Sequence, residues 1–124
     1  MTRPLPADGG RIVPLPRLAR TIARLRRRRP RPRLVLANGL FDLLHVGHVR
    51  YLKAAGRLGD LLVVAINDDR SARILRGPGR PIVPAAERAR LVAALDGVDY
   101  VVLFSSPTVA PLLRRLRPDI QCKG

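Results

Sequence analysis

From residue 34 onward, short apolar runs alternate with segments whose apolar residues recur every three or four positions. The apolar runs predict strands at Leu34–Ala37, Leu61–Ile66 and Val98–Phe104, with the start of a fourth at Ile120–Cys122. The segments between them predict helices at Val46–Ala55, Ser71–Leu75, Ala85–Leu95 and Val109–Leu116. This alternation predicts an α/β fold, a doubly wound parallel sheet with right-handed crossovers. Ligands of such a sheet bind at the carboxyl ends of its strands.

The first 33 residues follow a different pattern. Four prolines precede position 17 and predict a flexible lead. Leu18, Ile22 and Leu25 then form one apolar stripe of a short helix whose other face is arginine, and an R-P-R-P-R segment ends it. We expect this helix to pack by one edge on the domain, although a basic amphipathic helix could also lie on a membrane or a polyanion. The predicted organisation is a basic, proline-rich arm over residues 1–33 and a domain over residues 34–124.

The positive charge is concentrated in that arm. The whole chain has a formal net charge of +15, and residues 1–33 hold eleven arginines against one acidic residue. Arginine outnumbers lysine by 22 to 2, which biased codon usage explains as readily as selection for guanidinium chemistry. The total charge therefore gives no reason to expect a nucleic-acid partner.

Other bulk properties concern the compartment. The longest apolar run has six residues, too few to span a membrane, and no apolar stretch follows the early arginines as in a secretory signal. The single cysteine, Cys122, excludes an internal disulfide framework and agrees with a reducing environment. We therefore expect a soluble cytoplasmic protein with no membrane partner.

The chemistry is concentrated in the stretch N-G-L-F-D-L-L-H-V-G-H, residues 38–48, between the first predicted strand and the first long helix. A helix N-terminus presents unpaired N–H groups and a partial positive charge, so it suits a phosphate. We expect Gly39 to let the chain turn sharply and Gly47 to leave room for a ligand. His45 and His48 lie three residues apart, which places both imidazoles on the same side of a helical turn.

Two imidazoles at a phosphate site suit nucleotidyl transfer. In that reaction negative charge builds on the oxygens of the α-phosphate and on the leaving pyrophosphate, and fixed hydrogen-bond donors stabilise the transition state. No covalent intermediate is needed, because the second substrate brings a phosphate oxygen as nucleophile.

This stretch resembles the H-x-G-H signature of the cytidylyltransferase-like nucleotidyltransferases, in the longer form G-x-F-D-x-x-H-x-G-H. Within that family, residues 34–124 are most similar to the adenylyltransferase domain of bifunctional heptose-phosphate kinase/adenylyltransferases. Further matching segments are R-G-P-G-R-P-I (76–82), E-R-A-R-L-V-A-A-L (87–95), V-D-Y-V-V (98–102), and R-P-D-I followed by K-G (117–124). The resemblance implies a Rossmann-like sheet.

The resemblance also implies roles for individual residues. The implied catalytic residues are His45 and His48, which would hold the triphosphate and the transition state, and Arg88, which would lie near the reacting phosphates. Arg76 stands where the family has a lysine that reaches the phosphates, and Asp42 would orient the loop or the substrate. The implied nucleotide-binding set is Gly39, Leu40, Phe41, Asp42, His45, Gly47, His48 and Arg76.

The function implied is transfer of AMP from ATP to a sugar 1-phosphate of the heptose 1-phosphate type, with release of pyrophosphate. Mg²⁺ would accompany the nucleoside triphosphate, and a homodimer is compatible with the family. One alternative is a cytidylyltransferase that uses CTP and glycerol 3-phosphate or a related phospho-alcohol. Another is a non-catalytic nucleotide-binding or interaction module, whose arginine-rich arm would contact an acidic partner.

The family's pattern extends past Lys123–Gly124 with a glycine, an aspartate, a further strand and a Ser-Thr-Thr segment that closes over the triphosphate. We therefore expect the C-terminal part of the domain to lie outside these 124 residues. The 124-residue chain alone would then bind ATP weakly and turn over slowly or not at all.

Other interpretations concern one or two residues each. The two histidines could be surface or helix-capping residues, but both lie inside the motif and flank Gly47, so we expect a functional role. A zinc site at the two histidines lacks third and fourth ligands nearby, so no metal site is expected there. Asp68 and Asp69 could bind magnesium or cap the following helix, and we expect the cap. Cys122 is expected to be a core residue rather than a nucleophile.

Overall fold

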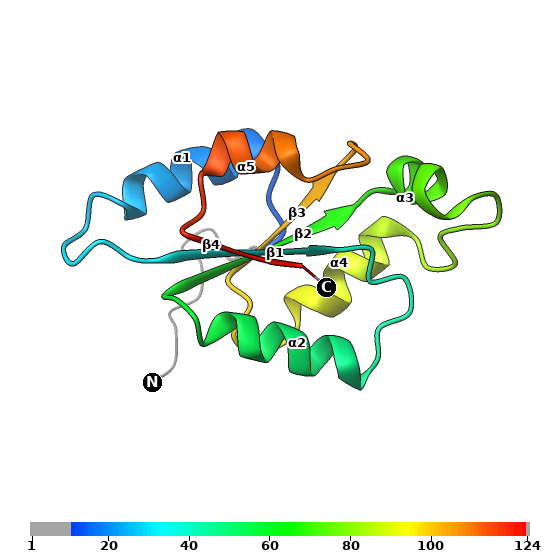
Figure 1. Ribbon diagram of the computed structural model, residues 1–124, viewed down its shortest axis with the longest axis horizontal. Coiled ribbons are helices and arrows are strands. Elements are labelled where there is room, and N and C mark those ends of the chain that lie inside the picture. Colours follow the sequence, from blue (N-terminus) through cyan, green and yellow to red (C-terminus); the bar gives the residue numbers. More distant parts are fainter. Residues whose placement is uncertain (1–10, 124) are drawn as a thin grey trace.

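The computed structural model describes residues 11–123. Within them, helices and strands alternate from α1 to β4 (Figure 1). The strands are β1 (Leu34–Gly39), β2 (Leu61–Asn67), β3 (Tyr100–Phe104) and β4 (Ile120–Lys123). The helices are α1 (Leu15–Leu25), α2 (Val46–Gly56), α3 (Asp69–Arg76), α4 (Ala85–Ala93) and α5 (Ala110–Leu116). Every element predicted from the apolar pattern is present, with ends that differ by a few residues.

The strands form one parallel sheet in the order β3-β2-β1-β4. Helices α1 and α5 cover one face of the sheet, and α2 and α4 cover the other (Figure 1). The chain order reverses between β1 and β4, where the crossovers change direction. The predicted α/β class, with a Rossmann-like parallel sheet covered on both faces, is confirmed. None of the described helices is long and apolar enough to cross a membrane.

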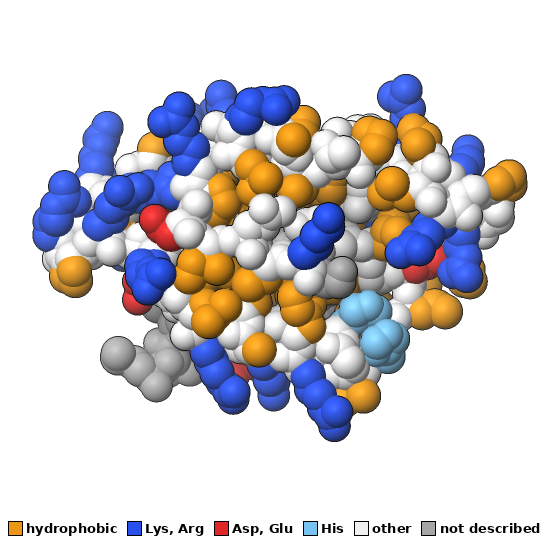
Figure 2. All heavy atoms as spheres, viewed as in Figure 1, with side chains coloured by type: hydrophobic (Ala, Val, Ile, Leu, Met, Phe, Trp, Pro, Cys, Tyr) orange, Lys and Arg blue, Asp and Glu red, His pale blue; other side chains and the backbone are white. Residues whose placement is uncertain are grey.

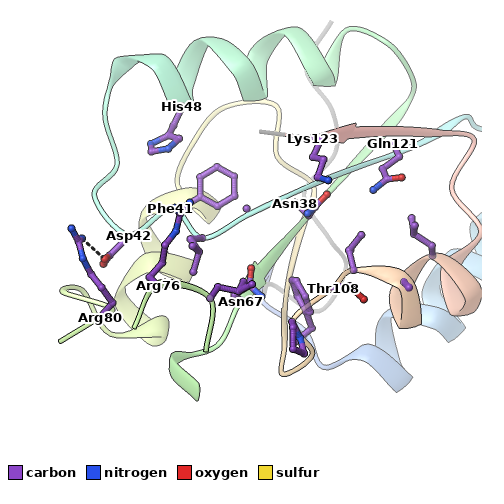
Figure 3. A pocket seen from close by; sticks show the side chains of 18 of the residues that line it. Asn38, Phe41, Asp42, His48, Asn67, Arg76, Arg80, Thr108, Gln121 and Lys123 are labelled. Carbon is purple, nitrogen blue, oxygen red and sulfur yellow. Dashed lines mark hydrogen bonds and ion pairs between the residues drawn. The ribbon is translucent and has the colours of Figure 1, made fainter. Parts of the chain in front are cut away.

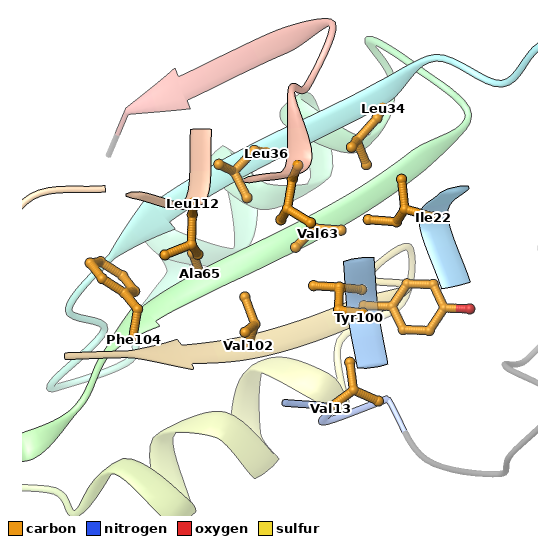
Figure 4. Close-up of a cluster of buried hydrophobic side chains, with 12 residues drawn as sticks. Val13, Ile22, Leu34, Leu36, Val63, Ala65, Tyr100, Val102, Phe104 and Leu112 are labelled. Carbon is orange, nitrogen blue, oxygen red and sulfur yellow. The ribbon is translucent and has the colours of Figure 1, made fainter. Parts of the chain in front are cut away.

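The core consists of two layers, one on each face of the sheet, because successive strand residues point to opposite faces. In β1, Leu34 and Leu36 face α1 and α5, whereas Val35 and Ala37 face α2 and α4, and all four are fully buried. Figure 4 shows the first layer, in which side chains of β1, β2 and β3 meet Ile22 of α1 and Leu112 of α5.

Helix α1 packs by one edge on this core, as its apolar stripe predicted. Leu18 is 0% exposed and Ile22 is 1% exposed, and both belong to the same cluster as Leu34. Fully burying one such side chain contributes roughly 1.5–3 kcal/mol. A helix that packs by one stripe needs few apolar residues, so arginines can occupy its other face. The flexible lead predicted before the helix falls mainly on residues 1–10, outside the described residues.

Two further contacts attach the segment around α1. The backbone N–H of Val13 donates to the carbonyl of Val101 in β3 at 3.0 Å. At the other end of the helix, the Arg26 guanidinium donates to the carbonyl of Leu116 at 2.6 Å and to that of Arg117. These carbonyls lie at the C-terminus of α5, where a cation is favoured by the helix dipole.

Candidate active site

A cleft of about 840 Å³ opens at the carboxyl ends of the strands. The last residue of every strand lines it: Gly39 of β1, Asn67 of β2, Phe104 of β3 and Lys123 of β4. This is where a doubly wound sheet binds its ligands, and it agrees with the expectation from the sequence. Figure 3 shows His48, Arg76 and Arg80 on one side of the cleft, with Thr108, Gln121 and Lys123 on the other.

The motif loop, defined as residues 38–48, ends in a reciprocal cap at the start of α2. His45 is the N-cap residue, and its Nδ1 accepts a hydrogen bond from the Gly47 N–H at 3.0 Å. In return, Nδ1 of His48 accepts from the His45 N–H at 3.2 Å. The two rings stack with their centroids 4.0 Å apart. The spacing of the motif thus builds a capping box from two histidines, and the imidazoles satisfy N–H groups that a helix start otherwise leaves unpaired.

These hydrogen bonds also determine the tautomers. Because Nδ1 accepts a hydrogen bond in both rings, the proton of each neutral imidazole lies on Nε2. The pKa of His48 is lowered, first by burial and then by the neighbouring His45. His48 is therefore a neutral N–H donor near pH 7. His48 lines the cleft, whereas the exposed His45 stacks on it from outside the lining set.

The two glycines of the motif loop have different reasons to be there. A Cβ at Gly47 would lie 2.8 Å from Cε1 of His45, so a side chain there would displace the ring that caps the helix. A Cβ at Gly39 would lie 3.0 Å from the Phe41 ring. The sharp turn expected at Gly39 is made at Phe41 instead, which has a φ of 51°. Gly39 makes room for that turn, because the Phe41 ring folds back over it.

Asp42 holds the segment that connects α3 to α4, here named the Gly/Pro loop (residues 77–84). Its carboxylate accepts hydrogen bonds from the N–H groups of Ile82 and Val83 at 2.8 and 2.9 Å. It also forms an ion pair with Arg80 at 3.0 Å (Figure 3). Burial would raise the pKa of Asp42, but these hydrogen bonds and the Arg80 charge outweigh it and lower the pKa. Of the two expected roles for Asp42, the contacts support orientation of the loop.

Arg88, which the resemblance implied as a catalytic residue, lies behind the cleft wall. Its side chain is 0% exposed and does not line the cleft. The guanidinium donates to the carbonyls of Leu40 at 2.6 Å and Asn67 at 2.8 Å. It also donates to the carbonyl of Val83 and forms an ion pair with Asp69. Arg88 therefore binds protein groups behind the cleft.

Arg76 lies at the C-terminus of α3 and lines the cleft. Leu40, Phe41 and Asp42 also line the cleft, and Phe41 packs edge-on against His48 with a centroid distance of 5.2 Å.

Sequence reasoning missed several residues of the opposite wall, of which Lys123 carries charge. The parallel pairing of β1 with β4 sets Lys123 opposite Asn38, and both line the cleft. The signal available was its position as the last residue of a predicted strand, because all parallel strands end at the same edge. Thr108 and Gln121, which line the same wall, carried no comparable signal.

The remaining expectations concern Asp68, Asp69 and Cys122. Asp68 caps α3, since its carboxylate accepts from the Ser71 N–H at 2.9 Å, and the predicted cap is confirmed. Asp69 pairs with Arg88. Among residues 11–123, no group of three or more His, Cys, Asp or Glu side chains could hold a metal ion. Cys122 is half-buried against the layer under α2, and its carbonyl accepts from the Tyr51 hydroxyl at 2.8 Å. Burial of the Tyr51 hydroxyl, and then the nearby thiol of Cys122, raise the pKa of Tyr51 to about 12.

Comparison with known proteins gives close relatives. The chain is 52% identical over 105 residues to the bifunctional protein HldE of Syntrophotalea carbinolica, which covers 85% of this chain and 21% of the relative. It is 47% identical over 121 residues to the bifunctional protein HldE of Halorhodospira halophila, with 98% and 25% covered. The chain thus spans about a quarter or less of the length of these curated relatives.

A solved structure is also similar. It is described as the lipopolysaccharide core biosynthesis protein from Thermoplasma volcanium, with a TM-score of 0.66 and 36% sequence identity. The similarity covers 73% of this chain and 72% of that one. The family model described as cytidylyltransferase-like matches residues 36–124, which include the motif loop, the Gly/Pro loop and Lys123. The chain therefore belongs to the cytidylyltransferase-like family.

Proposed function

We propose that this chain is a nucleotidyltransferase domain that transfers AMP from ATP to a sugar 1-phosphate of the heptose 1-phosphate type. The observation that carries the proposal is the pair of imidazoles at the start of α2. They are held in one tautomer by the backbone, and His48 lines the cleft. Preorganised donors of this kind stabilise developing negative charge without reorganising during the reaction.

The proposed reaction needs no covalent intermediate. A phosphate oxygen of the sugar 1-phosphate attacks the α-phosphorus of ATP, and the bond from that phosphorus to the bridging oxygen of the β-phosphate breaks. Pyrophosphate leaves with the electron pair of that bond. The Nε2–H groups of His48 and His45 would donate to the phosphate oxygens, whose charge is greatest in the transition state. No proton has to move, because the attacking phosphate is already ionised.

Cations of the cleft would neutralise the rest of the charge. Arg76 and Lys123 line it from opposite walls, so both could reach a triphosphate between them. Arg80 also lines the cleft but is already paired with Asp42. Mg²⁺ would enter as part of the substrate, bound to the triphosphate, and would shield its charge in the same step.

Three comparisons support a sugar phosphate as the acceptor. The motif loop and the Gly/Pro loop resemble the adenylyltransferase domain of heptose-phosphate enzymes. The two relatives named above are bifunctional HldE proteins, and the similar solved structure is described as a lipopolysaccharide core biosynthesis protein. The single cysteine is consistent with action in the cytoplasm.

The nearest competing function is a cytidylyltransferase that acts on glycerol 3-phosphate or a related phospho-alcohol. The description of the matching family favours it, and the H-x-G-H signature is common to both enzyme types. The two candidates differ in the base and in the acceptor, so one assay separates them.

The test combines binding and turnover. Binding of ATP and of CTP, each with Mg²⁺, is measured by calorimetry, and pyrophosphate release is then measured with a panel of sugar 1-phosphates and polyol phosphates. We expect weak binding of both nucleotides, tighter for ATP than for CTP, and slow release of pyrophosphate only with a sugar 1-phosphate. A preference for CTP with a polyol phosphate would support the competitor, and equal failure of both nucleotides to bind would contradict both.

A further inference from the structure

The guanidinium of Arg88 connects three segments: the motif loop, the junction of β2 with α3, and the end of the Gly/Pro loop. Nη1 donates to the carbonyls of Leu40 in the motif loop and Asn67 at the end of β2. Nε donates to the carbonyl of Val83 at 2.8 Å, and Nη2 donates to the carboxylate of Asp69 at 2.9 Å. Three of these four partners are backbone carbonyls, so the contacts hold the course of the main chain.

The hydrogen bond from Arg88 to the carbonyl of Leu40 is linked to His48 through the neighbouring Phe41. Leu40 precedes Phe41, whose φ of 51° lies in the left-handed region that a phenylalanine rarely adopts. Such a conformation persists only where surrounding contacts hold it. The Phe41 ring is buried and packs edge-on against His48. A shift of the Leu40 carbonyl would therefore move Phe41 and, with it, the imidazole that lines the cleft.

The hydrogen bond from Arg88 to the carbonyl of Val83 fixes the end of the Gly/Pro loop. Asp42 holds the N–H groups of Ile82 and Val83, while Arg88 holds the carbonyl of Val83. Both peptide groups of Val83 are thus bound by side chains, one from the motif loop and one from α4. The motif loop and the Gly/Pro loop, which carries Arg80 into the cleft wall, are thereby joined into one unit.

We propose that Arg88 is a positioning residue that fixes the motif loop and the Gly/Pro loop relative to each other, and that it does not touch the nucleotide. This inference rests on the proposed function. It assigns Arg88 an action through Leu40, Phe41 and His48, in place of direct contact with phosphate. Its guanidinium is enclosed by protein, and three of its partners are carbonyl oxygens that a phosphate would have to displace.

The main test replaces Arg88 with lysine. Lysine keeps the charge, but its single ammonium cannot span partners that the planar guanidinium reaches in several directions. The matched control is Arg90→Lys, at an exposed position two residues further along the same helix. Three quantities are measured on each 124-residue variant: the thermal midpoint, the imidazole resonances of the two histidines, and the dissociation constant for Mg²⁺-ATP.

We expect Arg88→Lys to unfold cooperatively, to shift the imidazole resonances of His48, and to bind Mg²⁺-ATP at least tenfold more weakly. Arg90→Lys should match the wild type in all three. Weaker binding with unchanged His48 resonances would mean that Arg88 contacts the nucleotide and would overturn the proposal. A lower thermal midpoint with unchanged resonances and affinity would reduce Arg88 to a stabilising residue and would overturn it equally.

Two further measurements keep the proposal separate from the proposed function and from folding. If the wild type binds neither ATP nor CTP, the function fails, but the His48 resonances of Arg88→Lys still decide the positioning role. If Arg88→Lys does not fold, the Nε–H resonance of Arg88 is followed in the wild type during an Mg²⁺-ATP titration. It should exchange slowly with water and keep its position while the cleft arginines shift. Rapid exchange, or a shift as large as that of Arg76, would contradict the proposal.

Discussion

Helix α1 and the motif loop are both attached to the central sheet, but different forces hold them. Helix α1 is held by buried aliphatic side chains, Leu18 and Ile22 above all, while arginines occupy its outer face. The motif loop is held by directed polar bonds from Asp42, His45, His48 and Arg88. Apolar packing tolerates changes of shape better than a hydrogen-bond network tolerates the loss of one member. Changes in α1 should therefore affect stability, and changes around the motif loop should affect binding and turnover.

The two surfaces also differ in charge. Figure 2 shows many lysine and arginine side chains at the upper left, where Figure 1 places α1, with others below along α2 and at the right, and the two histidines at the start of α2. The arginines of α1 are exposed. Arg26, which follows α1 directly, is half-buried and joins this helix to α5. Arg88 is fully buried behind the cleft wall, so it is not a surface charge. The position of an arginine relative to the sheet thus decides whether it acts as solvated charge or as scaffold.

The largest effect is expected from removing the buried side chains that hold α1. Leu18→Ala and Ile22→Ala should each lower the free energy of unfolding by about 2–5 kcal/mol, because each leaves a cavity under α1. Urea unfolding measures the loss, and Arg24→Ala on the exposed face of the same helix is the control. The affinity of the folded fraction for Mg²⁺-ATP should stay unchanged. Unaltered stability of both variants would show that α1 is not part of the core.

The second prediction concerns the hydrogen-bonded motif loop. His48→Ala should lower the turnover number by on the order of a hundredfold or more, since a fixed donor at a developing charge is worth that much. Its thermal midpoint should fall little, because only one helix-capping bond is lost. Pyrophosphate release and thermal unfolding, measured on the same preparation, separate the two effects. An unchanged turnover number would remove His48 from the catalytic set.

A smaller effect is expected at Gly47. Alanine is normally a better helix former than glycine by up to about 1 kcal/mol. At this position, however, its Cβ would meet the His45 ring at 2.8 Å, so the cap opens and the gain is lost. We expect Gly47→Ala to leave the free energy of unfolding within about 1 kcal/mol of the wild type and to weaken nucleotide binding several-fold. The control is Gly56→Ala at the other end of α2, which should leave binding unchanged.

The smallest expected effect is the pH dependence of stability that His48 causes. The pKa of His48 is lowered in the folded chain, by burial and then by His45, so the folded state binds this proton less readily than the unfolded state. Its contribution to stability is therefore fully present above the unfolded pKa of about 6.5 and is lost as the pH falls through the lower folded pKa. An imidazole titration followed by NMR should give a midpoint below about 6.5 for His48. A midpoint above that value would show that the ring is stabilised as a cation, contrary to its place in the cap.

The sequence by itself determined the features that depend on local pattern. The runs around Val35 and Val63 are apolar on both faces, which only a covered parallel strand satisfies, so the strands and their order in the chain could be predicted. The shared side of the His45 and His48 rings is also local, because the two residues lie three positions apart, whereas the cap that they form is seen only in the structure.

Only the tertiary structure decided what each arginine of the chain does. Arg88 and Arg90 stand two apart on α4 and carry the same chemistry, yet Arg88 is fully buried and Arg90 is exposed. Lys123 reaches the cleft because the register of β4 against β1 puts it there. The stripe of α1 predicted its packing, but only the folded sheet shows that Leu18 and Ile22 join the same cluster as Leu34. Local pattern depends on neighbours within a few residues, whereas burial and hydrogen-bond partners depend on segments that approach only when the whole chain has folded.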